Sequence, residues 1–338
     1  MDQTFLKITF LPGLKSVVLD EVTRYPELHI IEQGDEEIYL EATLQFETIL
    51  NLKSIINVYL VKRDAKLNPH YLSNHKSILG NLIEIVLKDR NKLFKSFTLS
   101  CAGSDSKEVG EIQNFIATTY KLLPDEEADM KIYIGKSDDV WEIGVCLTPR
   151  PLSLREYKIA NLKGALNPTI AYVMNTFCNL ASAQSYLNIC SGSGTLLIEA
   201  AQSGFAGKLF GFDIDGKHNA LAVQNIKKAG FIKSIQLKTA DILENPDLGT
   251  FDCITSDLPF GMLVSKDEDL QKLYETFVRY CEKVLDPEGR LVVYTTEHEL
   301  LDKILQQSKF KIIEKLGLKL VTNVNSYLYP KIFVCEFK

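Results

Sequence analysis

The stretch SYLNICSGSGTLLIEAAQSG, residues 185–204, decides the fold class of this chain. Its first five residues predict a buried strand, and TLLIEAAQSG predicts a helix that ends at Gly204. Between them, Gly192 and Gly194 allow the backbone to approach a ligand closely, and the free N–H groups at the helix start favour anionic or polar atoms. Leu197 stands where a dinucleotide-binding loop has its third glycine, which disfavours NAD and FAD as ligands.

The alternation of strand and helix continues to the end of the chain. DPEG, residues 286–289, predicts a turn, and FKIIEKLGLKLV and KIFVCEF predict a closing hairpin. Alternation of this kind is typical of α/β proteins with a mostly parallel sheet and helices on both faces. The further strands are predicted at 208–214, 235–241, 251–257 and 290–296, and the helices at 218–230, 269–285 and 298–308.

Residues 1–150 follow a different pattern, which predicts an α+β region made of two small units. FLKITF, IYLEA, NVYLVKR and SFTLSC predict strands, and MKIYIG and VWEIGVCL resemble a strand pair. A basic linker, 151–166, would join this region to an α/β domain at 167–338. Four cations in or beside the linker are candidates for phosphate contact, with an ordinary solvated face as the alternative for each: Arg150, Arg155, Lys158 and Lys163.

The composition excludes several classes of protein. Hydrophobic residues make up 46% of the chain and charged residues 24%, as in a folded soluble protein. No apolar run approaches the ~20 residues of a membrane span, and the first residues predict no secretory signal. The seven cysteines and five histidines are scattered singly, which disfavours a zinc site or a disulfide framework and suits the cytoplasm. The net charge of −6 supports binding to a polyanion only through local basic patches.

Acidic residues end three of the predicted strands, at the edge where ligands of such folds bind. Asp213 in GFDID is suited to accept both hydroxyls of a ribose, and Asp241 in TADI is suited to accept from an amine such as that of adenine. Taken singly, each acid is better explained as a solvated strand end or a helix N-cap. Taken with the glycine loop and with Asp257, they predict a cofactor that contains adenosine.

The sequence SDLPFG, which begins one residue before Asp257, predicts a pocket for a flat ring, with a packed turn as the alternative. The exocyclic amine of a purine is a poor nucleophile because its lone pair is delocalised, and acceptors on its N–H groups favour its attack on a methyl group. Asp257 and the Leu258 carbonyl would supply these acceptors. Pro259 would stiffen the turn and Phe260 would stack on the base, an interaction worth roughly 1–3 kcal/mol.

These motifs together resemble the class I S-adenosylmethionine-dependent methyltransferases, and more narrowly the RNA guanine-N2 methyltransferases that carry an N-terminal THUMP domain. The similar stretches are LREYK, ALNPTIAYVM, SGSGTLLIEAA, GFDID, ADI and SDLPFG, with a more diffuse similarity in FLPGLKSVVLDEV. The resemblance implies a Rossmann-like domain with a mixed, mostly parallel seven-stranded sheet, preceded by an α+β THUMP-like RNA-binding region. It also implies S-adenosyl-L-methionine as the cofactor and RNA, above all tRNA, as the partner. The protein is expected to be a monomer and to bind no metal.

The same resemblance assigns roles to individual residues. The catalytic residues would be Asp257, Leu258, Pro259 and Phe260. The cofactor-binding residues would be Pro168, Thr169, Asn188, Ser191, Gly192, Gly194, Thr195, Asp213, Ile214, Asp241 and Ile242.

The chain departs from the family at the start of the glycine loop, where the family has Asp-Pro and this chain has Asn188-Ile189. Asparagine keeps a hydrogen-bonding oxygen but lacks the charge that complements the ammonium group of the cofactor, which would cost about 1 kcal/mol of affinity. Ser191 likewise replaces a cysteine. The predicted function is methylation of guanosine N2 in tRNA. The alternatives are the same reaction on ribosomal RNA, methylation of DNA adenine or protein glutamine, and a catalytically lapsed RNA-binding homologue.

Overall fold

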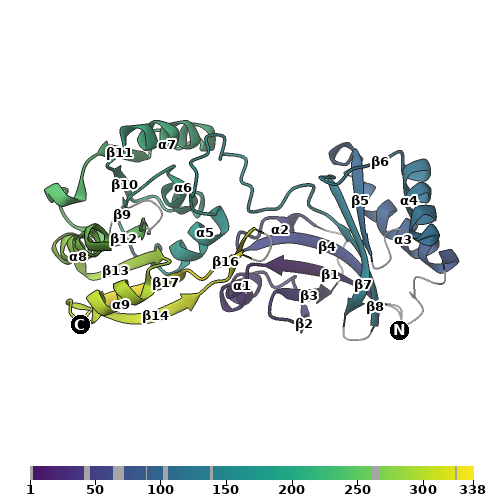
Figure 1. Cartoon of the computed structure of the whole chain (residues 1–338), viewed down its shortest axis with the longest axis horizontal. Coiled ribbons are helices and arrows are strands. Elements are labelled where there is room, and N and C mark those ends of the chain that lie inside the picture. Colours follow the sequence, from purple (N-terminus) through teal and green to yellow (C-terminus); the bar gives the residue numbers. More distant parts are fainter. Residues whose placement is uncertain are drawn as a thin grey trace. The chain divides into compact units, whose positions relative to one another are not determined.

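A computed structural model of the protein shows two compact units, whose elements are labelled in Figure 1. The first unit contains Met1–Phe10 and Lys15–Leu152, and the second contains Leu11–Leu14 and Ser153–Lys338. The structure describes residues 3–41, 46–63, 72–88, 90–101, 106–137, 140–259, 267–323 and 326–338.

The strands of the first unit form one eight-stranded sheet in the order β2-β3-β1-β4-β8-β7-β5-β6. The expectation of two small units was wrong, because β4 pairs with β1 on one side and with β8 on the other and so joins both halves into one sheet. The strands are β1 (Gln3–Phe10), β2 (Ile30–Gln33), β3 (Glu37–Glu41), β4 (Ile55–Arg63), β5 (Ser96–Cys101), β6 (Leu123–Pro124), β7 (Met130–Ser137) and β8 (Val140–Cys146). The helices are α1 (Lys15–Val22), α2 (Glu47–Leu50), α3 (Leu72–Leu87), η1 (Asn91–Leu93) and α4 (Lys107–Tyr120).

The second unit contains a seven-stranded sheet in the order β11-β10-β9-β12-β13-β17-β14. Every pair in it is parallel except the two pairs made by β17. The predicted mixed, mostly parallel seven-stranded sheet is therefore confirmed. Its strands are β9 (Ser185–Ile189), β10 (Lys208–Asp213), β11 (Ile235–Thr239), β12 (Phe251–Asp257), β13 (Leu285–Thr295), β14 (Phe310–Gly317) and β17 (Lys331–Phe337).

Capping residues explain where several helices of this unit begin and end. The Asp215 side chain accepts from the Lys217 N–H at the start of α7, and Gly230 closes that helix with a φ of 87°. Asn167 caps α5 through the Thr169 N–H, with Pro168 in the first turn. The helices are α5 (Pro168–Thr176), α6 (Thr195–Gln202), α7 (Gly216–Ala229), η2 (Ile242–Glu244), α8 (Asp267–Val284) and α9 (His298–Gln306).

Two local predictions need correction near the end of the chain. The DPEG turn lies inside β13, because Phe251 pairs with Leu285 and Cys253 pairs with Arg290, so the residues between Leu285 and Arg290 form a bulge in the strand. The closing hairpin is confirmed as the antiparallel pair β14–β17. However, the last two residues of the first run, Leu320 and Val321, belong to a separate two-stranded sheet, β15 (Leu320–Asn323) and β16 (Ser326–Leu328).

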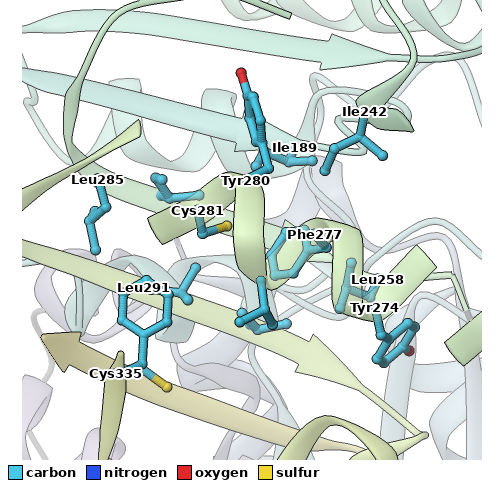
Figure 2. Packing of buried hydrophobic residues seen from close by; sticks show 14 of the residues in the cluster. Ile189, Ile242, Leu258, Tyr274, Phe277, Tyr280, Cys281, Leu285, Leu291 and Cys335 are labelled. Atoms are coloured by element: carbon cyan, nitrogen blue, oxygen red, sulfur yellow. The ribbon is translucent and has the colours of Figure 1, made fainter. Parts of the chain in front are cut away.

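The core of the second unit lies where α8 and α9 cover one face of the sheet. Phe277 and Cys281 of α8 pack with residues of the central strands, such as Ile189 and Leu291 (Figure 2). All four side chains are fully buried. This packing fixes the carboxyl ends of β9 and β12, from which the predicted site residues project.

Candidate active site

The glycine loop leaves β9 through a run of unusual backbone conformations. Cys190, Gly192 and Gly194 have φ angles of 56°, 50° and 79°. A non-glycine residue in this region costs about 1 kcal/mol or more, so Cys190 holds local strain. The loop is fixed because the Ser191 N–H donates to the Phe212 carbonyl at 3.0 Å and the Gly194 N–H donates to the Ser191 carbonyl at 2.8 Å. The loop thus begins α6 with backbone N–H groups available to a ligand.

Asp213 ends β10 beside this loop and is buried. Its Oδ2 accepts from the Gly192 N–H at 2.8 Å, and its Oδ1 accepts from the Asp215 N–H at 3.0 Å and lies 3.1 Å from Nδ1 of His218. A carboxylate has about four acceptor positions, so room remains for a hydroxyl. Ile214 follows with 66% of its surface exposed, an apolar side chain placed at the ligand-binding edge.

Three of the predicted cofactor-binding residues carry a buried oxygen without a hydrogen-bond partner. They are Thr169 Oγ1, Asn188 Oδ1 and Ser191 Oγ, and each residue is at most 5% exposed. A buried polar atom left without a partner costs about 1–3 kcal/mol, so such atoms require an explanation. The sequence assigned these three residues to one polar ligand, and a ligand bound there would supply the missing partners.

The orientation of the Asn188 amide follows from its surroundings. Its Nδ2 donates to the Thr255 carbonyl at 3.2 Å and to the Ile189 carbonyl at 3.3 Å. Two carbonyl oxygens can only face the NH₂ group, so Oδ1 must be the atom that lacks a partner. The residue that departs from the family pattern therefore presents an acceptor, as the family's aspartate would.

Asp241 and Ile242 have structural partners of their own. Asp241 Oδ1 accepts from the Leu243 N–H at 2.8 Å and caps η2. This is the helix N-cap role that the sequence offered as the alternative to cofactor binding. Ile242 is 6% exposed and belongs to the hydrophobic core. Their predicted cofactor contacts stay predictions.

Asp257 ends β12 and is half-buried, with its neighbour Leu258 turned into the core. Burial raises the pKa of the Asp257 carboxyl to about 7, and the Lys158 ammonium opposes this rise. Burial likewise lowers the pKa of Lys158 to about 8, against the carboxylates of Asp257 and Glu199. Each group therefore changes charge near neutral pH and is sensitive to the other.

The turn after β12 is anchored on both sides. The Leu258 N–H donates to the Tyr294 carbonyl at 3.0 Å, and the Leu258 side chain points into the cluster that contains Tyr274 (Figure 2). The Tyr274 hydroxyl donates to the Pro259 carbonyl at 3.1 Å. Leu258 can thus act only through its backbone. The predicted stacking residue Phe260 and the adjacent Gly261 lie outside the described residues.

The segment expected to be a basic linker, 151–166, is largely part of the second unit. Arg155 Nε contacts Glu199 Oε1 of α6 at 3.2 Å, and the Tyr157 hydroxyl donates to the same oxygen at 2.7 Å. The Arg155 and Glu199 side chains are 7% and 1% exposed. Lys158 Nζ donates to the Leu166 carbonyl at 2.7 Å. Arg155 and Lys158 therefore have intramolecular partners in place of the solvated position that phosphate contact requires.

The other two predicted RNA-binding cations, Arg150 and Lys163, are exposed. Arg150 belongs to the first unit and Lys163 to the second. Both have the solvated position that their predicted role needs.

Three residues of the site were not identified from the sequence. Glu199 holds Arg155, Tyr274 holds the turn after β12, and Asn225 of α7 holds the glycine loop. Asn225 Nδ2 donates to the Ser193 carbonyl at 3.1 Å and to the Ala160 carbonyl at 3.0 Å. A single acid in the apolar run TLLIEAA was a usable signal for Glu199, because a buried carboxylate needs a cationic partner.

Two features are absent from the described residues. No group of three or more His, Cys, Asp or Glu side chains there is placed to hold a metal ion. Likewise, the described helices include none with the length and apolar character of a membrane span.

Comparison with known proteins places this geometry in context. Residues 155–322 match the family described as RMKL-like, methyltransferase domain. A tRNA (guanine(6)-N2)-methyltransferase of Thermus thermophilus is 30% identical over 200 residues, which cover 57% of this chain and 56% of that protein. The U6 snRNA (guanine-N(2))-methyltransferase THUMPD2 of Bos taurus is 28% identical over 219 residues, 62% of this chain and 42% of that protein. The matched regions thus span about half the length of these relatives. The crystal structure of TrmN from Thermus thermophilus superposes with a TM-score of 0.81 over 99% of this chain and 100% of its own, at 23% identity, so the fold is shared along the whole chain.

Proposed function

Because residues 155–322 belong to the RMKL-like family of methyltransferase domains, we propose that this protein transfers a methyl group from S-adenosyl-L-methionine to the N2 amine of a guanosine in tRNA. The two named relatives carry out this reaction on different RNAs, which supports the guanine amine more strongly than either RNA. The tRNA-modifying relative has the higher identity, which favours tRNA over U6 snRNA and over ribosomal RNA. The seven cysteines are scattered singly along the sequence, which suits an enzyme of the cytoplasm.

The observation that carries the proposal is the set of three partnerless oxygens around the glycine loop. Asn188 Oδ1 and Ser191 Oγ lie at the end of β9 and Thr169 Oγ1 at the start of α5, where they would bind the amino and carboxyl groups of the cofactor's methionine. Asp213, with acceptor capacity remaining, would bind the ribose, and Ile214 would cover the adenine. When bound, S-adenosyl-L-methionine supplies an electrophilic methyl group on its sulfonium.

Asp257 would act on the guanine amine. As a carboxylate it accepts from the N2 hydrogens, which favours the rehybridisation that frees the nitrogen lone pair, and it stabilises the positive charge that develops on N2. Its pKa near 7 also allows one of its oxygens to take the proton that the methylated amine releases. The turn at Leu258 and Pro259, held by Tyr274, would fix the position of the base.

The N-terminal region, residues 1–150, is proposed to bind RNA as a THUMP-like region away from the reacting base, joined through 151–166 to the methyltransferase domain at 167–338. The chain carries a net charge of −6, and residues 1–150 hold 23 acids against 17 cations, so RNA contact must rely on local cations such as Arg150 and Lys163.

Two measurements test the proposal. Isothermal titration with S-adenosyl-L-methionine should give heat of binding; no detectable binding at high protein concentration would favour a lapsed RNA-binding homologue, the reading suggested by Asn188. Mass spectrometry of nucleosides from tRNA and ribosomal RNA incubated with the protein should show N2-methylguanosine in tRNA alone. Methylated adenine in a DNA substrate, or methylated glutamine in a protein, would replace the proposed acceptor.

A variant tests the assigned residue. Asp257→Asn should reduce kcat by about 10² to 10³, the range for loss of one charge-stabilising group, and should leave cofactor affinity unchanged. Asp247→Asn, which changes an exposed acid at the loop before β12, is the matched control. Near-normal turnover of Asp257→Asn would refute the role of this carboxylate.

A further inference from the structure

The small sheet β15–β16 presents one face with an unusual composition. Val321 pairs directly with Tyr327, and residues opposite each other in an antiparallel pair share a face. Leu320 pairs with Leu328, and because side chains alternate along a strand these two lie on the other face. Lys319 and Tyr329 flank the two strands and are placed beside Tyr327 by their contacts with its ring. We call the face of Lys319, Val321, Tyr327 and Tyr329 the hairpin face.

The apolar side chains of the hairpin face are open to solvent. Val321 is 74% exposed, Tyr329 57% and Tyr327 43%, while the opposite face is half-buried. The rings of Tyr327 and Tyr329 lie 6.5 Å apart, and Lys319 Nζ lies 4.5 Å from the centre of the Tyr327 ring. Two neighbouring exposed aromatic rings with a cation on one of them form the arrangement on which nucleic-acid bases stack.

The local charge favours a polyanion. From Lys315 to Cys335 the sequence contains three lysines and no acidic residue, in a chain whose net charge is −6. Lys315 pairs with Asp302 of α9, so the local excess of positive charge rests on Lys319 and Lys331. An acidic protein segment would also use the cations, but RNA offers both phosphates for the cations and flat bases for the two neighbouring rings. The charge and the rings together therefore select RNA as the occupant.

Topology places this face at the catalytic edge of the sheet. β14 runs parallel to β12, so the β15–β16 sheet, which follows β14, leaves from the same edge as Asp257. Asp257, Tyr294, Ile332 and Leu316 are in register across four adjacent strands. Three strand spacings separate Asp257 from Leu316, a lateral distance of about 14 Å.

We propose that the hairpin face is an RNA-binding surface that stacks unpaired nucleotides of the substrate flanking the target guanosine. The inference rests on the proposed function and adds a second group of RNA contacts, within the methyltransferase domain itself. The face would hold the RNA strand while the target base reaches Asp257.

The test compares the full-length wild type with Tyr327→Ala/Tyr329→Ala, measuring Kd for a tRNA transcript by fluorescence anisotropy and Kd for S-adenosyl-L-methionine by calorimetry. The double variant should bind tRNA at least tenfold more weakly and raise KM for tRNA, with kcat at saturating tRNA and cofactor affinity unchanged. Tyr327→Phe/Tyr329→Phe, which keeps the rings, should bind tRNA as the wild type does. Lys319→Gln should reduce the slope of log K against log salt by about 1.

Ile232→Ala is the matched control. Ile232 is 49% exposed but precedes β11, at the opposite edge of the sheet, so its loss should leave tRNA affinity unchanged. Unchanged tRNA affinity in the double alanine variant would overturn the inference. Loss of self-association in that variant, with normal tRNA affinity, would assign the face to a second copy of the chain and would also overturn it. Tight tRNA binding by the wild type without methylation would contradict the proposed function. The anisotropy comparison of wild type and double alanine variant would still test the hairpin face in that case.

Discussion

Replacing Arg155 by methionine distinguishes a structural role from RNA contact. The sequence assigned Arg155 to phosphate, whereas the structure places it against Glu199, with contacts of 3.2 Å and 3.4 Å between guanidinium nitrogens and carboxylate oxygens. Methionine keeps most of the side-chain volume and removes the charge. The buried Glu199 carboxylate would then keep only the Tyr157 hydroxyl, at 2.7 Å, among these contacts.

The expected loss of stability is large. Removing one partner of a buried ion pair costs about 3–5 kcal/mol, and because Tyr157 remains, the lower value of about 3 kcal/mol applies. For a unit of this size, Leu11–Leu14 with Ser153–Lys338, that free energy corresponds to a fall in Tm of roughly 6–12 °C. The double variant Arg155→Met/Glu199→Met should recover part of the loss, because no charge is left buried.

Differential scanning calorimetry would follow the transition of the second unit, identified as the one whose Tm rises when S-adenosyl-L-methionine is added. Lys163→Met, on the same segment but exposed, is the control and should leave this Tm within about 1 °C. An unchanged Tm in Arg155→Met, accompanied by weaker tRNA binding, would refute the structural role and restore the phosphate contact that the sequence suggested.

Three further variants address the site. Activity should rise with pH through about 7, because Asp257 must lose its proton to accept from the amine. In Lys158→Met the pKa of Asp257 should rise further, so the acidic limb of the kcat/KM profile should move to higher pH. An acidic limb that stays in place would contradict the coupling between the two residues. Asn188→Asp should destabilise the fold by about 1–3 kcal/mol and so lower the Tm, because a carboxylate has no hydrogen to donate to the Thr255 carbonyl that the amide now contacts. A higher Tm would show that the family's aspartate is accommodated. Tyr274→Phe should lower kcat several-fold with little change in cofactor affinity, because the Pro259 carbonyl loses its donor, and an equal loss in cofactor affinity would argue against a local effect on the turn.

The ionisation of Asp257 also bears on stability. Its pKa is near 4 in an unfolded chain and about 7 in the folded one, so the folded state retains a proton that the unfolded state loses between these values. The contribution of this group to stability is therefore fully present below pH 4 and is lost as the pH rises through 7. The proposed catalytic role of Asp257 thus requires the charged form that folding disfavours.

The predictability of the fold followed the strength of local patterns. The strands and helices from β9 to α7 have clear hydrophobic runs and explicit stops such as Gly230, and they were found from sequence. Helix α5 was not, because eight of its nine residues are buried and a helix that is apolar on all sides shows no amphipathic period. Its capping signal, Asn167 followed by Pro168, was present in the sequence.

Long-range pairing explains the other errors. The sequence identified β4 and β8 as strands but carries no local signal that they pair across some eighty positions, which is why two units were expected where one sheet exists. The same limit applies to the site. Glycines and acids at strand ends identify themselves by their type and spacing, whereas the partner of Arg155 lies forty-four positions away on α6.

The charged segment 153–166 is tied to the glycine loop by intramolecular contacts. Asn225 accepts from the Ala160 N–H at 2.8 Å and donates to both the Ala160 carbonyl and the Ser193 carbonyl of the glycine loop, so the segment and the loop share one side chain. The segment is also bound to α6 through Glu199, and α6 begins at the same loop. A change that loosens the segment must therefore reach the backbone N–H groups that are proposed to meet the cofactor. Substitutions at Arg155 should therefore alter cofactor affinity before they alter affinity for RNA, the reverse of what its charge suggests.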